Sequence, residues 1–144
     1  MLNAKAKKET KESRSFDFRT IKTFEDACKQ LELDPEVIPD VSMLPEEFRK
    51  AIINGYKLFI IYKAINNGWT PDWTNWNQYK YYPWFEVKAS KAVSSGFGFS
   101  DSDYGSTYSV TYVGSRLCTD TREKALYIAS TFQEVYKEYL LILK

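Results

Sequence analysis

The sequence predicts an α+β fold, in which a small antiparallel sheet of three to four strands packs against two long helices and one short helix. Two patterns indicate this class. Apolar residues recur at spacings of three and four over residues 46–68 and 122–144, as they do on amphipathic helices. Residues 84–117 instead alternate between apolar and polar side chains, as in strands with one face in solvent. Helices on both sides of a cluster of strands are typical of the α+β class.

Three elements are predicted ahead of these strands. The segment SFDFRTIK alternates Phe16 and Phe18 with polar residues and is predicted to form a short strand. Thr23 and Asp26 resemble a capping box and begin a short helix. The first long helix follows, and we expect most of it to be buried. Its apolar face comprises Phe48, Ile52, Tyr56, Phe59 and Ile60, and is widened by Ile53, Leu58, Ile61 and Ile65.

Three strands and one helix complete the predicted fold. The segment WFEVKAS begins at Trp84, SSGFGFSDSDY places Phe97 and Phe99 two residues apart, and STYSVTYVGSRLC alternates as far as Leu117. The motif DSDYG, which starts at Asp101, is expected to form a hairpin tip because it is rich in turn-forming residues. The motif DTRE then resembles a second capping box and begins a single closing helix.

The length of 144 residues suits one domain with a core of its own. We expect residues 16–144 to form this single α+β domain behind a disordered, lysine-rich tail of residues 1–15. The formal net charge of +1 provides no general attraction to nucleic acids or anionic membranes. The sequence shows neither an apolar run of about 18 residues nor the pattern of a signal peptide. We therefore expect a cytoplasmic protein that is kept inside the cell or assembled there into something larger, with no membrane partner.

The residue types exclude several chemistries. The chain has no histidine, which removes the commonest general base and the commonest metal ligand. Cys28 and Cys118 are far apart in sequence, and we expect reduced thiols, although spacing alone leaves a disulfide open. An EF-hand that starts at Asp101 would require glycine and an acid where Ser106 and Tyr112 stand. We predict a protein that is not an enzyme and that has no cofactor and no metal.

The most distinctive segment is GWTPDWTNWNQYKYYPWF, residues 68–85, which contains all four tryptophans. We interpret its rings chiefly as closing a small core against an ordered loop. The rings that point outward would bind another protein, because Trp, Tyr and Arg dominate the energies of many interfaces. The candidate binding residues are Trp73, Trp76, Tyr79, Lys80, Tyr81 and Arg116.

Binding of single-stranded nucleic acid is the alternative function. Aromatic residues within 69–85 would stack bases, while Lys80, Lys88 and the basic tail would contact phosphates. Asp72 and Glu86 oppose those two lysines, however, and such binders normally have a basic groove. The oligomeric state, the identity of the partner and any small ligand are left open by the sequence.

Three segments carry a resemblance to a known group: WNQYKYYPWFEV, SGFGFSDSDY and VGSRLCTDTREKALYIASTFQEVYKEYL. Over roughly residues 20–144 the chain resembles small uncharacterised proteins of bacteriophages, prophages and mobile elements of Bacteroides-type bacteria. The resemblance implies a protein of the host cytoplasm or of the virion, with a non-enzymatic role as an accessory protein that binds a phage or host protein. It implies no catalytic residues.

Overall fold

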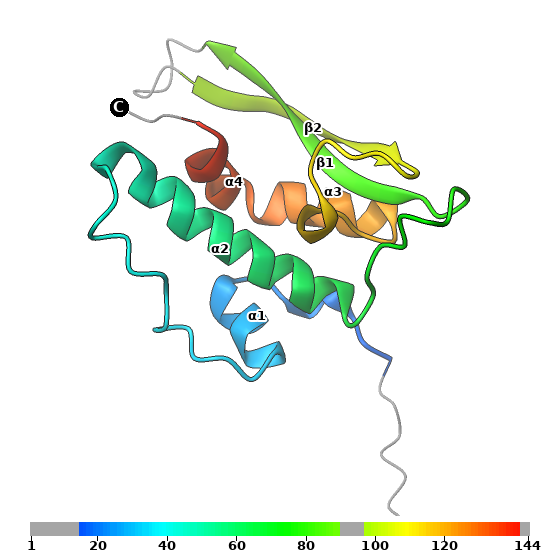
Figure 1. Cartoon of the computed structure of the whole chain (residues 1–144), viewed down its shortest axis with the longest axis horizontal. Helices are drawn as coiled ribbons and strands as arrows, with labels where there is room; N and C mark the ends of the chain where they lie inside the picture. The colour runs from blue at the N-terminus through cyan, green and yellow to red at the C-terminus, as the bar shows by residue number, and fades with distance from the viewer. Residues whose placement is uncertain (1–14, 90–96, 142–144) are drawn as a thin grey trace, which may run out of the picture.

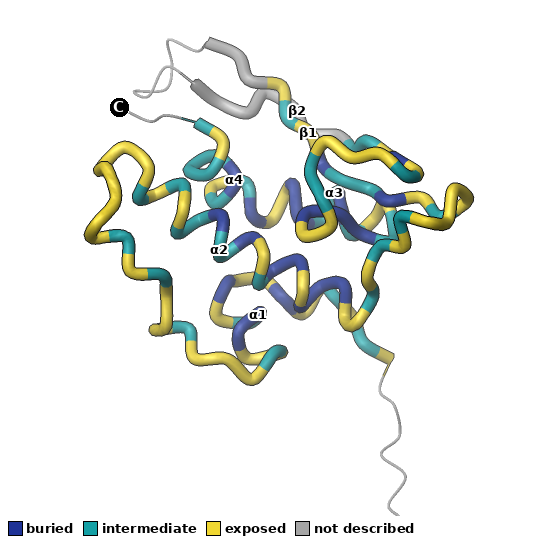
Figure 2. Tube along the Cα trace, viewed as in Figure 1, coloured by how far each residue is buried: buried dark blue, intermediate teal, exposed yellow. Residues whose placement is uncertain are grey.

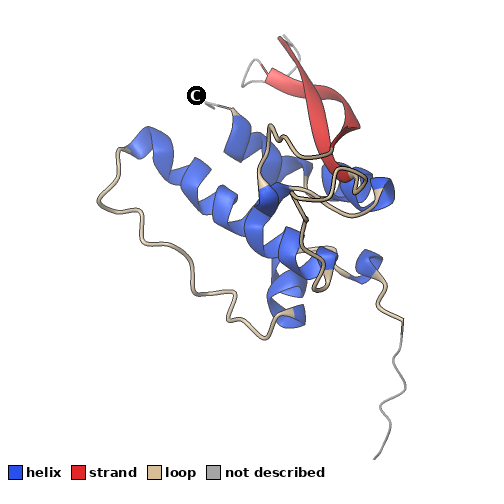
Figure 3. Cartoon of the chain, turned by 45° about the vertical axis from the view of Figure 1, so that its right-hand side comes forward, coloured by secondary structure: helices blue, strands red, loops and turns tan. Residues whose placement is uncertain are grey.

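The computed structural model describes residues 15–89 and 97–141, of which 87–89 and 97–103 are described by their backbone alone. Helix α2 runs through the middle, α1 packs against one side of it, and α3 and α4 lie along the other side (Figure 1). The β1–β2 hairpin packs on α3, as Figure 3 also shows. In chain order the elements are η1 (Phe18–Thr20), α1 (Phe24–Gln30), α2 (Glu46–Asn66), β1 (Lys80–Ala89), β2 (Phe97–Thr107), η2 (Ser115–Leu117), α3 (Arg122–Thr131) and α4 (Gln133–Leu140).

The α+β class is confirmed, with four helices and a two-stranded antiparallel sheet in the described part of the chain, but the prediction of three to four strands is wrong. Strands β1 and β2 pair along their whole length, with one irregularity between Glu86 and Val87. The third predicted strand does not form, and a single antiparallel bridge between Tyr81 and Thr119 takes its place. The DSDYG motif lies within β2, so the predicted hairpin tip is also wrong. The residues that join the two strands, 90–96, are outside the described part.

The start of the domain combines one wrong prediction and one confirmed prediction. The segment SFDFRTIK forms the 3₁₀ helix η1 rather than a strand, because the Asp17 side chain accepts a hydrogen bond from the Arg19 N–H and turns the chain. The capping box is confirmed: Thr23 Oγ1 accepts from the Asp26 N–H at 3.1 Å, and Asp26 accepts from the Thr23 N–H at 3.1 Å. The predicted tail, residues 1–15, lies outside the described residues except for Ser15.

The closing helix is broken, which the sequence did not predict. Helix α3 ends at Thr131 and α4 begins at Gln133, with Phe132 between them in a non-helical conformation. The Ser130 hydroxyl donates to the carbonyls of Leu126 and Tyr127 in the preceding turn. Hydroxyls that bond back in this way commonly bend helices, and the break redirects α4 along α2 (Figure 1).

The core lies where α2 meets α1, α3 and α4, and Figure 2 shows that the fully buried segments gather there. Gly55 allows close packing in this region, because a Cβ at this position would lie 3.1 Å from the Tyr139 ring. The buried apolar residues of the cluster include Ile21, Ala27, Leu58, Ile61, Tyr62, Ile65, Ile128, Phe132 and Tyr136.

The fully buried residues of α2 all lie between Gly55 and Asn66, whereas we expected most of the helix to be buried. Phe48, Ile52 and Phe59 were expected on the buried face, yet all three are exposed. Tyr56 and Ile60 are half-buried. The helix protrudes beyond α1 at its N-terminal end (Figure 1), so the side chains there face α4 but are not covered by α1.

Candidate functional site

The aromatic loop, defined as residues 67–79, joins α2 to β1 and is ordered by its own polar side chains. Asp72 Oδ1 accepts hydrogen bonds from the N–H and the hydroxyl of Thr74, at 2.9 and 2.6 Å. These bonds hold the pKa of the Asp72 carboxyl below its ordinary value. Gln78 Oε1 accepts from the Asp72 N–H at 2.7 Å, and Asn75 accepts from the backbone N–H two residues further on. Asp and Asn turns of this kind fix the shape of a loop that has no regular secondary structure.

Two contacts fasten the aromatic loop to the rest of the domain. Trp73 Nε1 donates to Ser115 Oγ in η2 at 2.6 Å. Lys80 Nζ donates to the Asn75 carbonyl at 3.2 Å and lies 5.2 Å from the centre of the Trp73 ring. Lys80 is 0% exposed, so its charge is enclosed by the loop that it holds. Lysine is rarely buried without a partner, and here an aromatic face and a carbonyl provide that partner.

The eight aromatic residues between Trp69 and Phe85 divide between packing and exposure. None is fully buried: Trp69, Trp73, Tyr81, Tyr82 and Phe85 are half-buried, whereas Trp76, Tyr79 and Trp84 are exposed. Trp76 has the highest exposure of the eight, at 68%. The segment therefore closes the surface of the domain and also presents large rings to solvent.

A row of four tyrosines continues the exposed aromatic surface across the hairpin. The ring centres of Tyr79 and Tyr81 are 5.9 Å apart, those of Tyr79 and Tyr108 are 4.7 Å apart, and those of Tyr81 and Tyr104 are 5.7 Å apart. The Tyr108 hydroxyl donates to the Tyr79 hydroxyl, and this bond raises the pKa of Tyr108. The Arg122 guanidinium lies 4.6 Å from the centre of the Tyr104 ring and supplies positive charge at the end of the tyrosine row.

A small pocket lies beside the aromatic loop, between α2 and η2. It has a volume of about 310 Å³ and combines the Phe59 and Trp69 rings with the cationic side chains of Lys63 and Arg116. The Arg116 guanidinium lies 6.0 Å from the centre of the Phe59 ring. Among the described residues neither cation forms an ion pair, and no acidic residue lines the pocket. The pocket would therefore favour an apolar group that carries negative charge.

The structure separates the six candidate binding residues by role. Trp76, Tyr79 and Tyr81 lie on the aromatic loop and the tyrosine row, and Arg116 borders the pocket. Trp73 fastens the loop. Lys80 is enclosed and cannot contact a ligand unless the loop opens, so its proposed contact with phosphate is not compatible with this conformation. The side chain of Lys88 lies outside the described part of the chain.

The sequence analysis missed Tyr104, Tyr108 and Arg122 as neighbours of the aromatic loop. Tyr104 reaches the tyrosine row because β2 pairs with β1 in a register that places it opposite Pro83. Arg122 reaches Tyr104 because α3 packs under the hairpin. A signal was present in the even spacing of Tyr104 and Tyr108, but only a known register would have placed these rings beside Tyr79.

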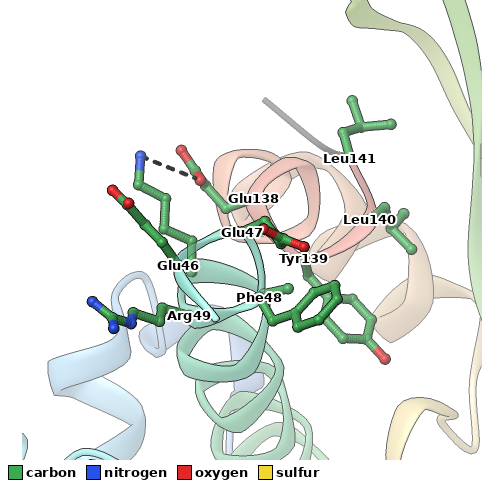
Figure 4. Close-up of a pocket in the computed structure, with 10 residues that line it drawn as sticks. Glu46, Glu47, Phe48, Arg49, Glu138, Tyr139, Leu140 and Leu141 are labelled. Atoms are coloured by element: carbon green, nitrogen blue, oxygen red, sulfur yellow. Dashed lines mark ion pairs between the residues drawn. The ribbon is translucent and has the colours of Figure 1, made fainter. Parts of the chain in front are cut away.

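A larger hollow lies at the other end of α2, between its first turns and the end of α4 (Figure 4). Its volume is about 530 Å³. Phe48, Tyr139 and Leu140 form its apolar part, and Glu47 and Glu138 contribute carboxylates. We refer to it as the acidic groove.

The two buried tyrosine hydroxyls of the interior have each other as partners. The hydroxyls of Tyr62 and Tyr136 bond to each other inside the core, and burial raises the pKa of both phenols. Burial also raises the pKa of the Cys118 thiol to about 11, and Cys28 is likewise a buried free thiol. Within the described residues no group of three His, Cys, Asp or Glu side chains could hold a metal ion.

None of the described helices is long and apolar enough to cross a membrane. Comparisons with protein-family models, with curated proteins and with solved structures found no match to this chain.

Proposed function

We propose that this chain is a non-enzymatic binding protein that recognises another protein through the aromatic loop and the tyrosine row. The observation that carries the proposal is Trp76, which is 68% exposed on a loop that is tied down on both sides. A large ring held in a fixed loop loses little conformational entropy when a partner covers it. Exposed Trp and Tyr side chains of this kind are frequent energetic centres of interfaces.

The charges around the aromatic loop favour a protein partner over single-stranded nucleic acid. Binders of single strands combine stacking rings with a basic groove that follows the phosphates. Lys80, which directly follows the aromatic loop, is enclosed, and Asp72 adds negative charge within the loop. Among the described residues, the cations that lie over aromatic rings are at Phe18, Phe24, Phe59, Trp73 and Tyr104, and not at the exposed Trp76 and Tyr79 rings.

The cations that are accessible lie to either side of the rings. Arg116 and Lys63 border the small pocket, and Arg122 lies over Tyr104. A partner that fits this surface presents apolar side chains to Trp76 and Tyr79, and carboxylates at its rim. The resemblance of the sequence to phage and mobile-element proteins suggests that the partner is a phage or host protein, and that the chain acts as an accessory or virion component.

The test replaces Trp76 by a photo-crosslinking phenylalanine analogue in cells that produce the chain, followed by identification of the crosslinked protein. Trp84, an exposed tryptophan on β1 outside the loop, provides the matched control position. We expect one partner to crosslink from position 76 and not from position 84. With purified partner, Trp76→Ala should weaken binding about tenfold or more, as expected for a central aromatic residue, and Trp84→Ala should not.

A titration with a single-stranded oligonucleotide distinguishes nucleic-acid binding from protein binding. We expect no quenching of tryptophan fluorescence at low salt. Quenching that Trp76→Ala abolishes and that salt weakens would replace the protein-binding proposal with nucleic-acid binding.

A further inference from the structure

The connection between α1 and α2 is both acidic and apolar at its surface. Residues 31–48 include six acidic residues and no lysine or arginine. Seven of the fifteen exposed large apolar side chains among the described residues lie in or next to this segment, and Met43 is 92% exposed. These seven are Leu33, Val37, Ile38, Met43, Leu44, Phe48 and Ile52. Clusters of exposed apolar side chains with polar groups around them commonly mark interaction surfaces.

This connection has a fixed shape although it contributes little to the core. Asp34 accepts a hydrogen bond from the Glu36 N–H at 2.9 Å, and Asp40 accepts one from the Ser42 N–H at 2.9 Å. The Arg49 side chain donates two hydrogen bonds to this connection: one to the Ser42 carbonyl, and one from Nε to the Leu44 carbonyl at 2.8 Å. The apolar side chains are thus held outward by an ordered backbone, as in a preformed binding surface.

The acidic groove continues this surface at the start of α2. In Figure 4, the Phe48 and Tyr139 rings lie side by side, and the carboxylates of Glu47 and Glu138 both lie above them, as does Leu140. Phe48 is 53% exposed at the mouth of the groove. Helix α4 therefore supplies one wall and α2 the other.

The cations at this end of α2 do little to neutralise the carboxylates. Arg49 points away from Phe48 (Figure 4), and its guanidinium is occupied by backbone carbonyls. Lys50 approaches Glu138 only to 3.9 Å, and the lysine side chain is 77% exposed. An exposed pair at this distance is weak, so Glu46 and Glu47 dominate the charge at the mouth of the groove.

We propose that the acidic groove, together with the connection that leads into it, binds a positively charged segment of another protein that also carries apolar side chains. Lysine or arginine would meet the carboxylates of Glu47 and Glu138, and an apolar side chain would cover Phe48. The site lies at the opposite end of α2 from the aromatic loop, and 21 helical residues span about 30 Å. The proposal is independent of the function proposed for the aromatic loop, and the chain would be able to hold two partners at once.

Charge distinguishes this occupant from a second copy of the chain. In a two-fold dimer the same patch faces itself, which would bring the acidic groups of both copies together while Arg49 is held by backbone carbonyls and Lys50 already lies near Glu138. An anionic membrane surface is disfavoured for the same reason. A basic partner removes the repulsion and covers the apolar side chains.

The test uses two synthetic amphipathic peptides with the same apolar positions, one with lysine and the other with glutamate at the polar positions. Each is titrated into the ¹⁵N-labelled chain at low salt. We expect the lysine peptide to shift the backbone signals around Phe48 and Leu140, with an affinity that falls as salt rises. The glutamate peptide should leave these signals unchanged. Equal binding of both peptides, or shifts confined to other parts of the domain, would overturn the proposal.

Variants locate the site and separate it from the aromatic loop. Glu47→Lys and Phe48→Ser should each weaken the lysine peptide about tenfold, as expected for residues at the centre of an interface. Both residues are exposed, so both variants should fold, which thermal unfolding verifies. Trp76→Ala should leave the affinity unchanged. Unchanged affinity in both groove variants, or a dimer in sedimentation that Phe48→Ser abolishes, would contradict the proposed basic partner.

Discussion

Replacing Trp73 or Trp76 by alanine separates the two roles of the aromatic loop. The residues are three positions apart, yet Trp73 is half-buried with a hydrogen bond to Ser115, whereas Trp76 is 68% exposed. Trp73→Ala removes that bond, which contributes about 0.5–1.5 kcal/mol. It also removes the aromatic face over the enclosed Lys80, worth about 0.5–2 kcal/mol, and the buried half of the indole, about 1–2 kcal/mol.

The free energy of unfolding should therefore fall by about 3 kcal/mol in Trp73→Ala, which for a domain of this size lowers Tm by roughly 10 °C. Trp76→Ala should stay within about 0.5 kcal/mol of the parent protein, as expected for an exposed residue. Urea unfolding and thermal unfolding, followed by circular dichroism, measure both values. Equal losses in the two variants would show that Trp76 belongs to the core and would refute its assignment to a binding surface.

Three further measurements test the interior and the loop. Tyr136→Phe leaves the buried Tyr62 hydroxyl without its partner and should lower the free energy of unfolding by about 1–3 kcal/mol. Replacing both tyrosines by Phe should lower it by less than the sum of the two single changes. Additive losses in urea unfolding would contradict the paired arrangement. The Cys118 thiol should react with a thiol reagent only after unfolding, because it is buried and its pKa is raised to about 11, so fast labelling of the native protein would contradict its burial. Hydrogen bonds from Thr74 lower the pKa of Asp72, so their contribution to stability is complete above the ordinary carboxyl pKa of about 4 and is lost as pH falls through the lowered pKa. Tryptophan fluorescence should therefore change in that acid range. The same change in Asp72→Asn would contradict Asp72 as its origin.

The sequence predicted the helices better than their packing. Helix α2 was found from its spacing, and the cap of α1 from Thr23 and Asp26, because both signals depend only on nearby residues. The break at Phe132 was missed because the apolar spacing continues across it. The exposure of Phe48 could not be foreseen, since periodicity gives the direction of a side chain and not the presence of a neighbouring layer.

The strand prediction failed where threonine side chains offered the backbone other partners. Tyr108, Val110 and Tyr112 alternate as in a strand, but the Thr107 hydroxyl bonds to the Val110 carbonyl. The Thr111 hydroxyl oxygen accepts from the N–H groups of Val113 and Gly114, at 3.1 and 2.7 Å. Such local bonds turn the chain in place of a sheet ladder.

Part of the candidate site followed from the sequence. The exposed rings Trp76 and Tyr79 stood out by composition alone. Lys80 was expected at the surface, as lysines usually are, and only the folded loop shows that the Trp73 ring and the Asn75 carbonyl enclose it. Contacts with Ser115 in η2 depend on the path of the chain after β2, which no local pattern determines.

The most direct test of the account is the behaviour of the indole N–H groups of Trp73 and Trp76 in ¹⁵N NMR spectra. The central claim is that an ordered loop holds one indole N–H in a hydrogen bond to Ser115 and exposes the other ring in a fixed position. The claim predicts slow exchange with water for the Trp73 signal and fast exchange for the Trp76 signal, with rigid backbone heteronuclear NOE values from Thr74 to Gln78. Equally fast exchange of both indoles, or a backbone that moves freely over that segment, would contradict it.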